Sequence, residues 1–150
     1  MVIIPWFSFF FLKKETIRHY TPVGFFTLFL MALYHELAYT QKWWKIAHPL
    51  VPQTIFYEAF AIGPFFIGTI WIFHLTYGKF WLYLIANVIT DAIFMFLMSP
   101  IFVKIGFYKW VNQTPFERYI HFIIIAVVIY GYHTWQRKGM KIEGVANQKY

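Results

Sequence analysis

The sequence contains no cysteine, and charged residues make up only 13% of its 150 positions. The missing cysteines exclude a disulfide scaffold and a thiolate metal site. A soluble domain usually carries about 25% charged residues, so this chain has too few polar side chains to cover a water-exposed surface. Hydrophobic residues make up 60% of the chain and aromatic residues 25%, which excludes a disordered chain. These figures predict a small integral membrane protein.

The net charge of +7 comes from 13 Lys and Arg against six Asp and Glu. The basic residues lie almost wholly between apolar segments, where they mark loops and face anionic lipid. No basic stripe or base-reading motif accompanies them, so nucleic acid is not expected as a partner. We expect membrane lipid as the partner of this charge, with a second copy of the chain or another membrane protein as further candidate partners.

Four apolar segments are long enough to cross a bilayer as helices. We predict spans at residues 22–40, 54–77, 80–103 and 115–136, a partial hydrophobic segment at 2–12, and a loose basic tail at 137–150. The pairs Thr21–Pro22 and Thr114–Pro115 each put an N-cap residue before a proline at the first helical position, which predicts a helix start. The aromatic and basic stretches 41–53 and 104–114 are predicted as loops. The fold class is therefore an all-α polytopic transmembrane helical bundle in a single domain.

Basic residues in short loops predict the orientation of such a bundle. Alternate connections form two groups, and the smaller one consists of Lys42, Lys45, Lys104, Lys109 and Arg118. The larger group consists of Lys13, Lys14, Arg18, Lys79, Arg137, Lys138, Lys141 and Lys149. The larger group is expected on the cytoplasmic side, which puts the C-terminus there as well.

Half of the acids, Glu36, Glu58 and Asp91, lie inside predicted spans, where an ionisable side chain is costly and marks a candidate functional site. Asn87 and Asp91 are four residues apart and share a helix face. With the predicted orientation, the three acids lie in the outer half of the bundle together with Arg118 and His121, which predicts a polar pocket open to the outer side. The alternatives are an interfacial Glu36, a first-turn acid at Glu58, and interhelical hydrogen bonds at Asn87 and Asp91.

Gly63 and Pro64 lie within the predicted span 54–77. Proline removes one backbone hydrogen bond, so a kink and a candidate hinge are expected there. His35 and Glu36 begin the zinc motif H-E-x-x-H, but Tyr39 takes the place of its second histidine. The sequence has no phosphate-binding loop, dinucleotide fingerprint or nucleophile elbow. The leading interpretation therefore includes no metal, no cofactor and no catalytic residue.

The stretch Ser99 to Trp110, SPIFVKIGFYKW, resembles a segment of an uncharacterised family of small multi-pass membrane proteins from spore-forming Gram-positive bacteria. The family pattern is Pro-Leu-Phe-x-x-x-Gly-Ile-Tyr-Lys, here Pro100 to Lys109. Glu36 near the end of one apolar segment, and Tyr57–Glu58 followed by Pro64, match the family in order. Ser99 departs from it, since the family often has Glu at that position. The resemblance covers roughly residues 10–135 and implies a multi-pass protein of the bacterial plasma membrane with no established activity.

Three functions are compatible with these features. The leading hypothesis is a non-enzymatic membrane component that binds a lipid headgroup, a small ion or a partner helix through Glu36, Glu58, Asn87 and Asp91. The second is a small proton-coupled transporter in which Asp91 titrates and Pro64 is the hinge. The third is a membrane enzyme acting on a lipid or isoprenoid, with Glu58 and Asp91 as an acid pair.

Overall fold

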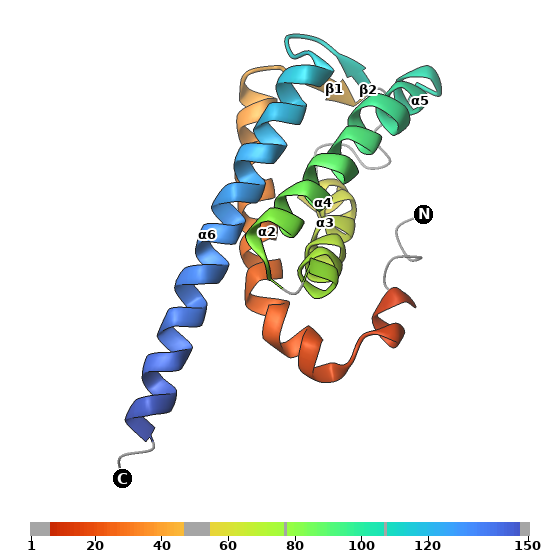
Figure 1. The fold of residues 1–150 in the computed structure, drawn as a ribbon. Coiled ribbons are helices and arrows are strands. Elements are labelled where there is room, and N and C mark those ends of the chain that lie inside the picture. Colours follow the sequence, from red (N-terminus) through yellow and green to blue (C-terminus); the bar gives the residue numbers. More distant parts are fainter. Residues whose placement is uncertain (1–6, 47–54, 77, 107, 148–150) are drawn as a thin grey trace.

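The computed structural model describes residues 7–46, 55–76, 78–106 and 108–147 (Figure 1). The side chains of residues 9, 44–46, 55–64, 108 and 140–147 lie outside this description. The elements follow the chain as a 3₁₀ turn η1 (Ser8–Phe11), helix α2 (Lys14–Thr40), strand β1 (Trp44–Ile46), helices α3 (Ile55–Thr76) and α4 (Phe80–Ala92), a π-helical segment η2 (Ile93–Met98), helix α5 (Ser99–Lys104), strand β2 (Tyr108–Trp110) and helix α6 (Pro115–Asn147). The elements of the described residues are helical apart from one short two-stranded ribbon.

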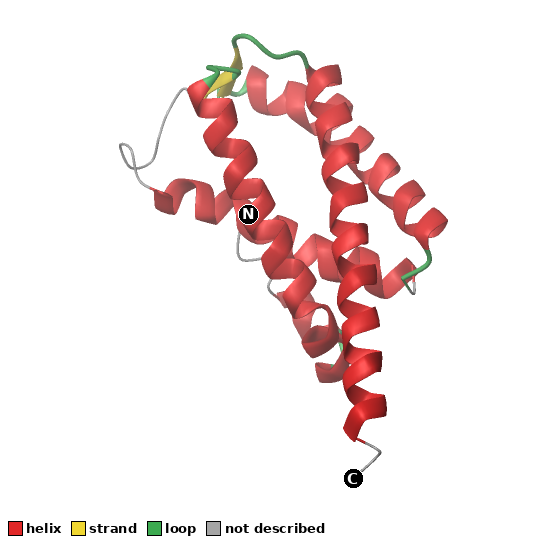
Figure 2. Cartoon of the chain, turned by 90° about the vertical axis from the view of Figure 1, so that its left-hand side faces the viewer, coloured by secondary structure: helices red, strands yellow, loops and turns green. Residues whose placement is uncertain are grey.

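The four long helices form a ring: α2 packs on α3, α3 on α4, α4 on α6, and α6 on α2. Aromatic side chains of α3 also contact α6 across the ring, as in the pair Phe73 and His133. Figures 1 and 2 show the ribbon at one end of this bundle and the end of α6 beyond the other. One core cluster draws residues from all four helices, namely Val23, Phe73, Tyr83, Ala126 and Ile129. The interior is therefore shared by all four helices.

Two helices are long and apolar enough to cross a membrane. They are Lys14–Thr40 and the continuous helix Phe80–Lys104 formed by α4, η2 and α5. Within the described residues, α3 contributes the shorter apolar helix Phe65–Thr76. The predicted spans 54–77 and 115–136 are not among these helices. By length and hydropathy, the described residues therefore contain two candidate spans and not the predicted four. In helix α6, tyrosines and histidines interrupt the apolar residues, and Glu117 and Arg118 lie in the first turn.

Helix α2 begins at Lys14 and contains Pro22, so the predicted start at Pro22 was wrong. The hydroxyl of Thr21 does not cap a helix start. It donates to the backbone oxygen of Ile17 at 2.6 Å, one turn back in the same helix. Hydroxyl side chains help an apolar helix tolerate an internal proline, because they bond backbone groups near the break. The cap-then-proline pattern therefore occurs here inside a helix.

The same pattern at Thr114–Pro115 does begin a helix, as predicted. The backbone N–H of Glu117 donates to the Thr114 hydroxyl at 3.2 Å, and the Thr114 N–H donates to Glu117 Oε2 at 2.7 Å. This reciprocal pair is a capping box. Helix α6 then continues to Asn147, so the tail predicted to be loose from residue 137 is helical as far as the structure describes it.

The loops predicted at 41–53 and 104–114 contain the two strands, which pair antiparallel with Trp44 opposite Trp110. Trp43 extends the contact, because its backbone oxygen accepts from Val111 N at 3.0 Å and Asn112 N at 3.1 Å. The ribbon joins the end of α2 to the start of α6. The predicted segment 2–12 is described from Phe7 only, and its described part forms the short turn η1; residues 2–6 lie outside the described residues.

Candidate functional site

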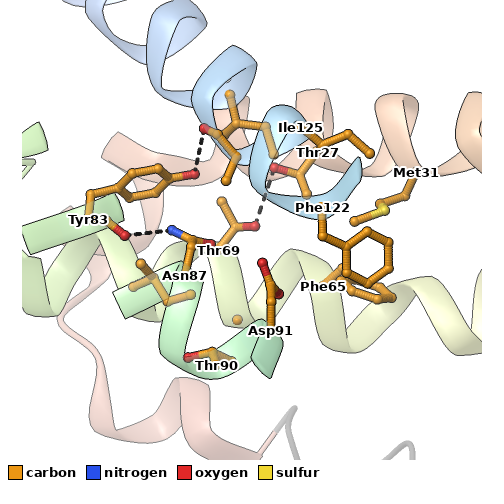
Figure 3. Close-up of a pocket in the computed structure, with 14 residues that line it drawn as sticks. Thr27, Met31, Phe65, Thr69, Tyr83, Asn87, Thr90, Asp91, Phe122 and Ile125 are labelled. Atoms are coloured by element: carbon orange, nitrogen blue, oxygen red, sulfur yellow. Dashed lines mark hydrogen bonds between the residues drawn. The ribbon is translucent and has the colours of Figure 1, made fainter. Parts of the chain in front are cut away.

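A cavity of about 130 Å³ lies inside the ring of four helices. All four contribute to its wall, and the part from α4 sits near the middle of the apolar helix Phe80–Lys104. The lining residues are Thr27, Met31, Phe65, Gly68, Thr69, Ile72, Tyr83, Asn87, Thr90, Asp91, Phe122, Ile125, Ala126 and Ile129. The wall is mostly apolar, and its polar groups are hydroxyls, one amide and one carboxyl (Figure 3).

Helix α4 supplies three polar side chains at four-residue spacing, Tyr83, Asn87 and Asp91. The Tyr83 side chain is only 1% exposed, and its hydroxyl donates to the backbone oxygen of Ala126 on α6 at 3.1 Å. The Asn87 Nδ2 donates to the backbone oxygen of Tyr83 at 2.8 Å. Because its N–H group is used in this way, the amide oxygen of Asn87 is left as an acceptor for a ligand.

Helices α2 and α3 contribute a short hydroxyl chain on the facing wall. The Thr69 hydroxyl donates to Thr27 Oγ1 at 3.3 Å, and the Thr27 hydroxyl donates to the backbone oxygen of Val23 at 3.0 Å. Thr27 is buried and Thr69 half-buried. In Figure 3 these two hydroxyls lie on the side of the cavity toward which the Asp91 carboxyl points. A hydroxyl oxygen has a second lone pair and can accept a further bond or coordinate a cation.

Asp91 is the one acid among the described residues of this wall, and its side chain is half-buried. It forms no hydrogen bond or ion pair with any residue that the structure describes. A carboxyl group in apolar surroundings is costly unless it is paired or protonated. The cavity therefore holds an acid that can be satisfied by a bound cation, a proton or water.

Of the four predicted pocket residues whose side chains the structure describes, it brings two together, Asn87 and Asp91. The side chain of Glu36 is exposed on α2 and is not part of the cavity wall. Glu58 lies in α3, and its side chain is outside the described residues. The helix continues through the predicted hinge Gly63–Pro64, whose side chains are likewise not described.

His121 belongs to a different cluster, below the ribbon. The Gln113 Nε2 lies 3.0 Å from His121 Nδ1 and donates to Tyr34 Oη at 3.2 Å. The His121 ring stacks on Trp43 with 5.3 Å between ring centroids. The neighbouring Arg118 is buried and lies over the rings of Trp110 and Phe122. These contacts attach the ribbon to the bundle.

Sequence reasoning missed Tyr83, Thr27 and Thr69 as members of the cavity wall. Tyr83 could have been predicted, because it precedes Asn87 by the same four residues that separate Asn87 from Asp91. Thr27 and Thr69 stand alone in apolar segments, and only the packing of α2 on α3 brings them together.

The described residues contain no group of three or more His, Asp or Glu side chains that could hold a metal ion. No family model, curated protein or solved structure matches this chain. The function is therefore argued from the cavity itself.

Proposed function

We propose that this chain is a multi-pass membrane protein whose bundle binds a small monovalent cation at Asp91, and that it is not an enzyme. The Asp91 carboxyl carries this proposal, because it has no partner among the described residues and faces oxygen atoms across a cavity inside the bundle. The cavity draws on α3 and α6 as much as on the two apolar helices. Since these helices pack against one another, α3 and α6 cross the membrane alongside α2 and α4.

The outer surface supports this topology. Large apolar side chains are exposed along α2 and α4, including Phe25, Phe29, Leu33, Ile85 and Ile89. Exposed apolar patches of this extent mark contact with lipid or a partner. The basic residues of the loops favour a cytoplasmic C-terminus, and the family resemblance favours the bacterial plasma membrane.

The donor set selects the kind of ion. Carboxylate, amide and hydroxyl oxygens are ligands for hard cations such as Na⁺. Thiolate and imidazole groups, which suit transition metals, do not occur among the described residues of the cavity wall. One carboxylate neutralises one positive charge, so a divalent ion would keep an uncompensated charge in apolar surroundings. The cavity is several times larger than one water molecule needs, which leaves room for an ion with bound water.

The test compares the unfolding midpoint of the purified protein in detergent with increasing NaCl and with choline chloride at the same ionic strength. A ligand that binds only the folded state raises stability in a saturable way, so Na⁺ should raise the midpoint more than choline. Asp91→Asn should abolish the difference. Glu36→Gln is the matched control, because it removes an exposed acid outside the cavity. Equal midpoints in the two salts, or an undiminished Na⁺ effect in Asp91→Asn, would contradict the proposal.

The runner-up function is a small proton-coupled transporter, favoured by the same carboxyl. A lone acid in the middle of an apolar helix is typical of a proton relay. Proteoliposomes with an internal pH dye would distinguish a transporter from a cation-binding component. A transporter dissipates a pH gradient in a way that depends on Asp91, and a binding component does not. The acid-pair enzyme remains a prediction that depends on the side chain of Glu58.

A further inference from the structure

Gly78 and Lys79, the described residues of the α3–α4 turn, lie at the end of the bundle opposite the ribbon (Figure 1). Gly78 adopts a left-handed backbone conformation there, with φ of 64°. Its backbone oxygen accepts a hydrogen bond from Tyr130 Oη on α6 at 2.8 Å. This bond fixes the turn against α6, so groups on the two elements keep a defined separation.

Two donor groups of α6 face this turn. A β-carbon built on Gly78 would lie 3.4 Å from His133 Nε2 and 3.7 Å from Arg137 Nη1. Tyr130, His133 and Arg137 follow at spacings of three and four, so they share one face of α6. Glycine at position 78 thus keeps open the space onto which both nitrogen atoms converge.

His133 is only 2% exposed and forms no hydrogen bond with any residue in the described part of the chain. Its ring packs against Phe73 and Tyr20, with centroid separations of 4.6 Å and 5.6 Å. The Nδ1 atom is buried without an acceptor. Since a buried N–H without an acceptor is costly, the neutral ring favours the proton on Nε2, which makes Nε2–H a donor directed at the turn.

The N-terminus of α4 begins beside the same turn. Its N-cap residue, Lys79, makes no side-chain capping hydrogen bond. The first N–H groups of a helix lack partners within the helix, and together with the helix dipole they favour an anion. Exposed basic residues occupy the same end of the bundle, on α2, on the turn and on α6: Lys13, Lys14, Arg18, Lys79, Arg137 and Lys138.

We propose that the α3–α4 turn and the face of α6 carrying His133 and Arg137 form a binding site for a phosphate group. Phosphate oxygens accept the Arg137 guanidinium, the His133 Nε2–H and the free N–H groups of α4. This site is separate from the Asp91 cavity and binds a ligand of opposite charge. The phosphate comes either from an anionic lipid headgroup at the membrane surface or from free phosphate in solution, and basic pockets between membrane helices on the cytoplasmic side are known lipid sites.

One experiment has two arms, both with the full chain in detergent micelles. In the first arm, native mass spectrometry counts bound lipid after addition of phosphatidylglycerol or of zwitterionic phosphatidylcholine. In the second arm, inorganic phosphate is titrated against the unfolding midpoint, with sodium chloride as the ionic-strength control. Enrichment of phosphatidylglycerol identifies a lipid headgroup as the source, and a phosphate-specific rise in the midpoint without lipid enrichment identifies free phosphate.

The variants test whether the site is local. Arg137→Gln should weaken binding about ten-fold or more, because a charge-assisted hydrogen bond contributes about that factor. Arg137→Lys should recover part of the binding, since lysine keeps the charge but lacks the paired N–H donors of the guanidinium group. Lys138→Gln removes the adjacent charge and should have a much smaller effect. Equal losses in Arg137→Gln and Lys138→Gln, or no binding in either arm, would overturn the proposal.

Discussion

The ring of Phe66 lies against the backbone of Gly24 so closely that a β-carbon at residue 24 would be 2.5 Å from Phe66 Cε2. Both residues are buried, and the contact lies between α2 and α3. Small residues allow close helix approach in membranes. Gly24 therefore sets the separation of the two helices that carry the Thr27–Thr69 hydrogen bond.

Gly24→Ala should destabilise the protein by about 1–3 kcal/mol, because overpacking must displace the Phe66 ring. The loss is expected although alanine is the better helix former by about 1 kcal/mol. Gly131→Ala is the control, since a β-carbon there meets no atom within 4 Å. Denaturant unfolding in micelles would measure both. A Gly24→Ala protein as stable as Gly131→Ala would contradict the close contact.

Tyr83→Phe should cost about 1 kcal/mol, the usual net value of one intramolecular hydrogen bond. The lost bond is the one from the Tyr83 hydroxyl to the backbone oxygen of Ala126. Tyr132→Phe serves as the control. The Tyr132 ring stacks on Phe26 with 4.1 Å between ring centroids, and the substitution removes the hydroxyl without changing this stacking. The unfolding free energies of the two variants should differ, and equal values would argue against the bond between α4 and α6.

Gln113→Leu should cost about 1–3 kcal/mol, because the buried amide of Gln113 contacts both Tyr34 Oη and His121 Nδ1. Trp43, which stacks on His121, should report the change through its fluorescence. Gln41→Leu is the matched control at an exposed position. If Gln113→Leu is no less stable than Gln41→Leu, the amide does not hold the ribbon to the bundle.

Thr114→Ala should cost about 1 kcal/mol, as expected for the loss of an N-cap. The hydroxyl of Thr114 accepts from the backbone of Glu117, and alanine cannot. Thr134→Ala provides the comparison, because the Thr134 hydroxyl is exposed and donates only within its own helix, to the Tyr130 backbone oxygen. Circular dichroism during thermal unfolding would compare them, with Thr134→Ala expected near wild type.

Local signals in the sequence predicted local structure well. The helical character of the chain, the apolar helix at 80–103, the start of α6 at Pro115 and the shared face of Asn87 and Asp91 all depend on neighbours within about four residues. The same signal was wrong at Pro22, because residues 14–21 continue the helix upstream and the Thr21 hydroxyl bonds backward to Ile17. A capping residue and a proline do not reveal what precedes them.

The remaining features depend on contacts between distant segments. The predicted spans gave the positions of Glu36 and His121 along their helices. Which side of each helix faces inward depends on packing, which the spans do not give. The structure puts Glu36 on the outside and His121 under the ribbon. The ribbon pairs Trp44 with Trp110, and the hydroxyl chain pairs Thr27 with Thr69. Neither pairing leaves a periodic trace in one sequence.

The π-helical segment after Asp91 has a consequence for helical phase. Tyr83, Asn87, Asp91, Met95 and Ser99 repeat every four residues, and each is buried or half-buried. In an ideal α-helix a four-residue step overshoots a full turn by about 40°, so such a stripe would rotate away from the bundle. The wider turn of η2, in which Ser99 N–H reaches back five residues to Phe94 O, unwinds the helix and offsets part of that rotation. Deleting the exposed Phe96 would remove the extra residue and restore a standard turn. Ser99 would then follow Asp91 by seven residues, about two turns of an α-helix, and would stay on the buried face.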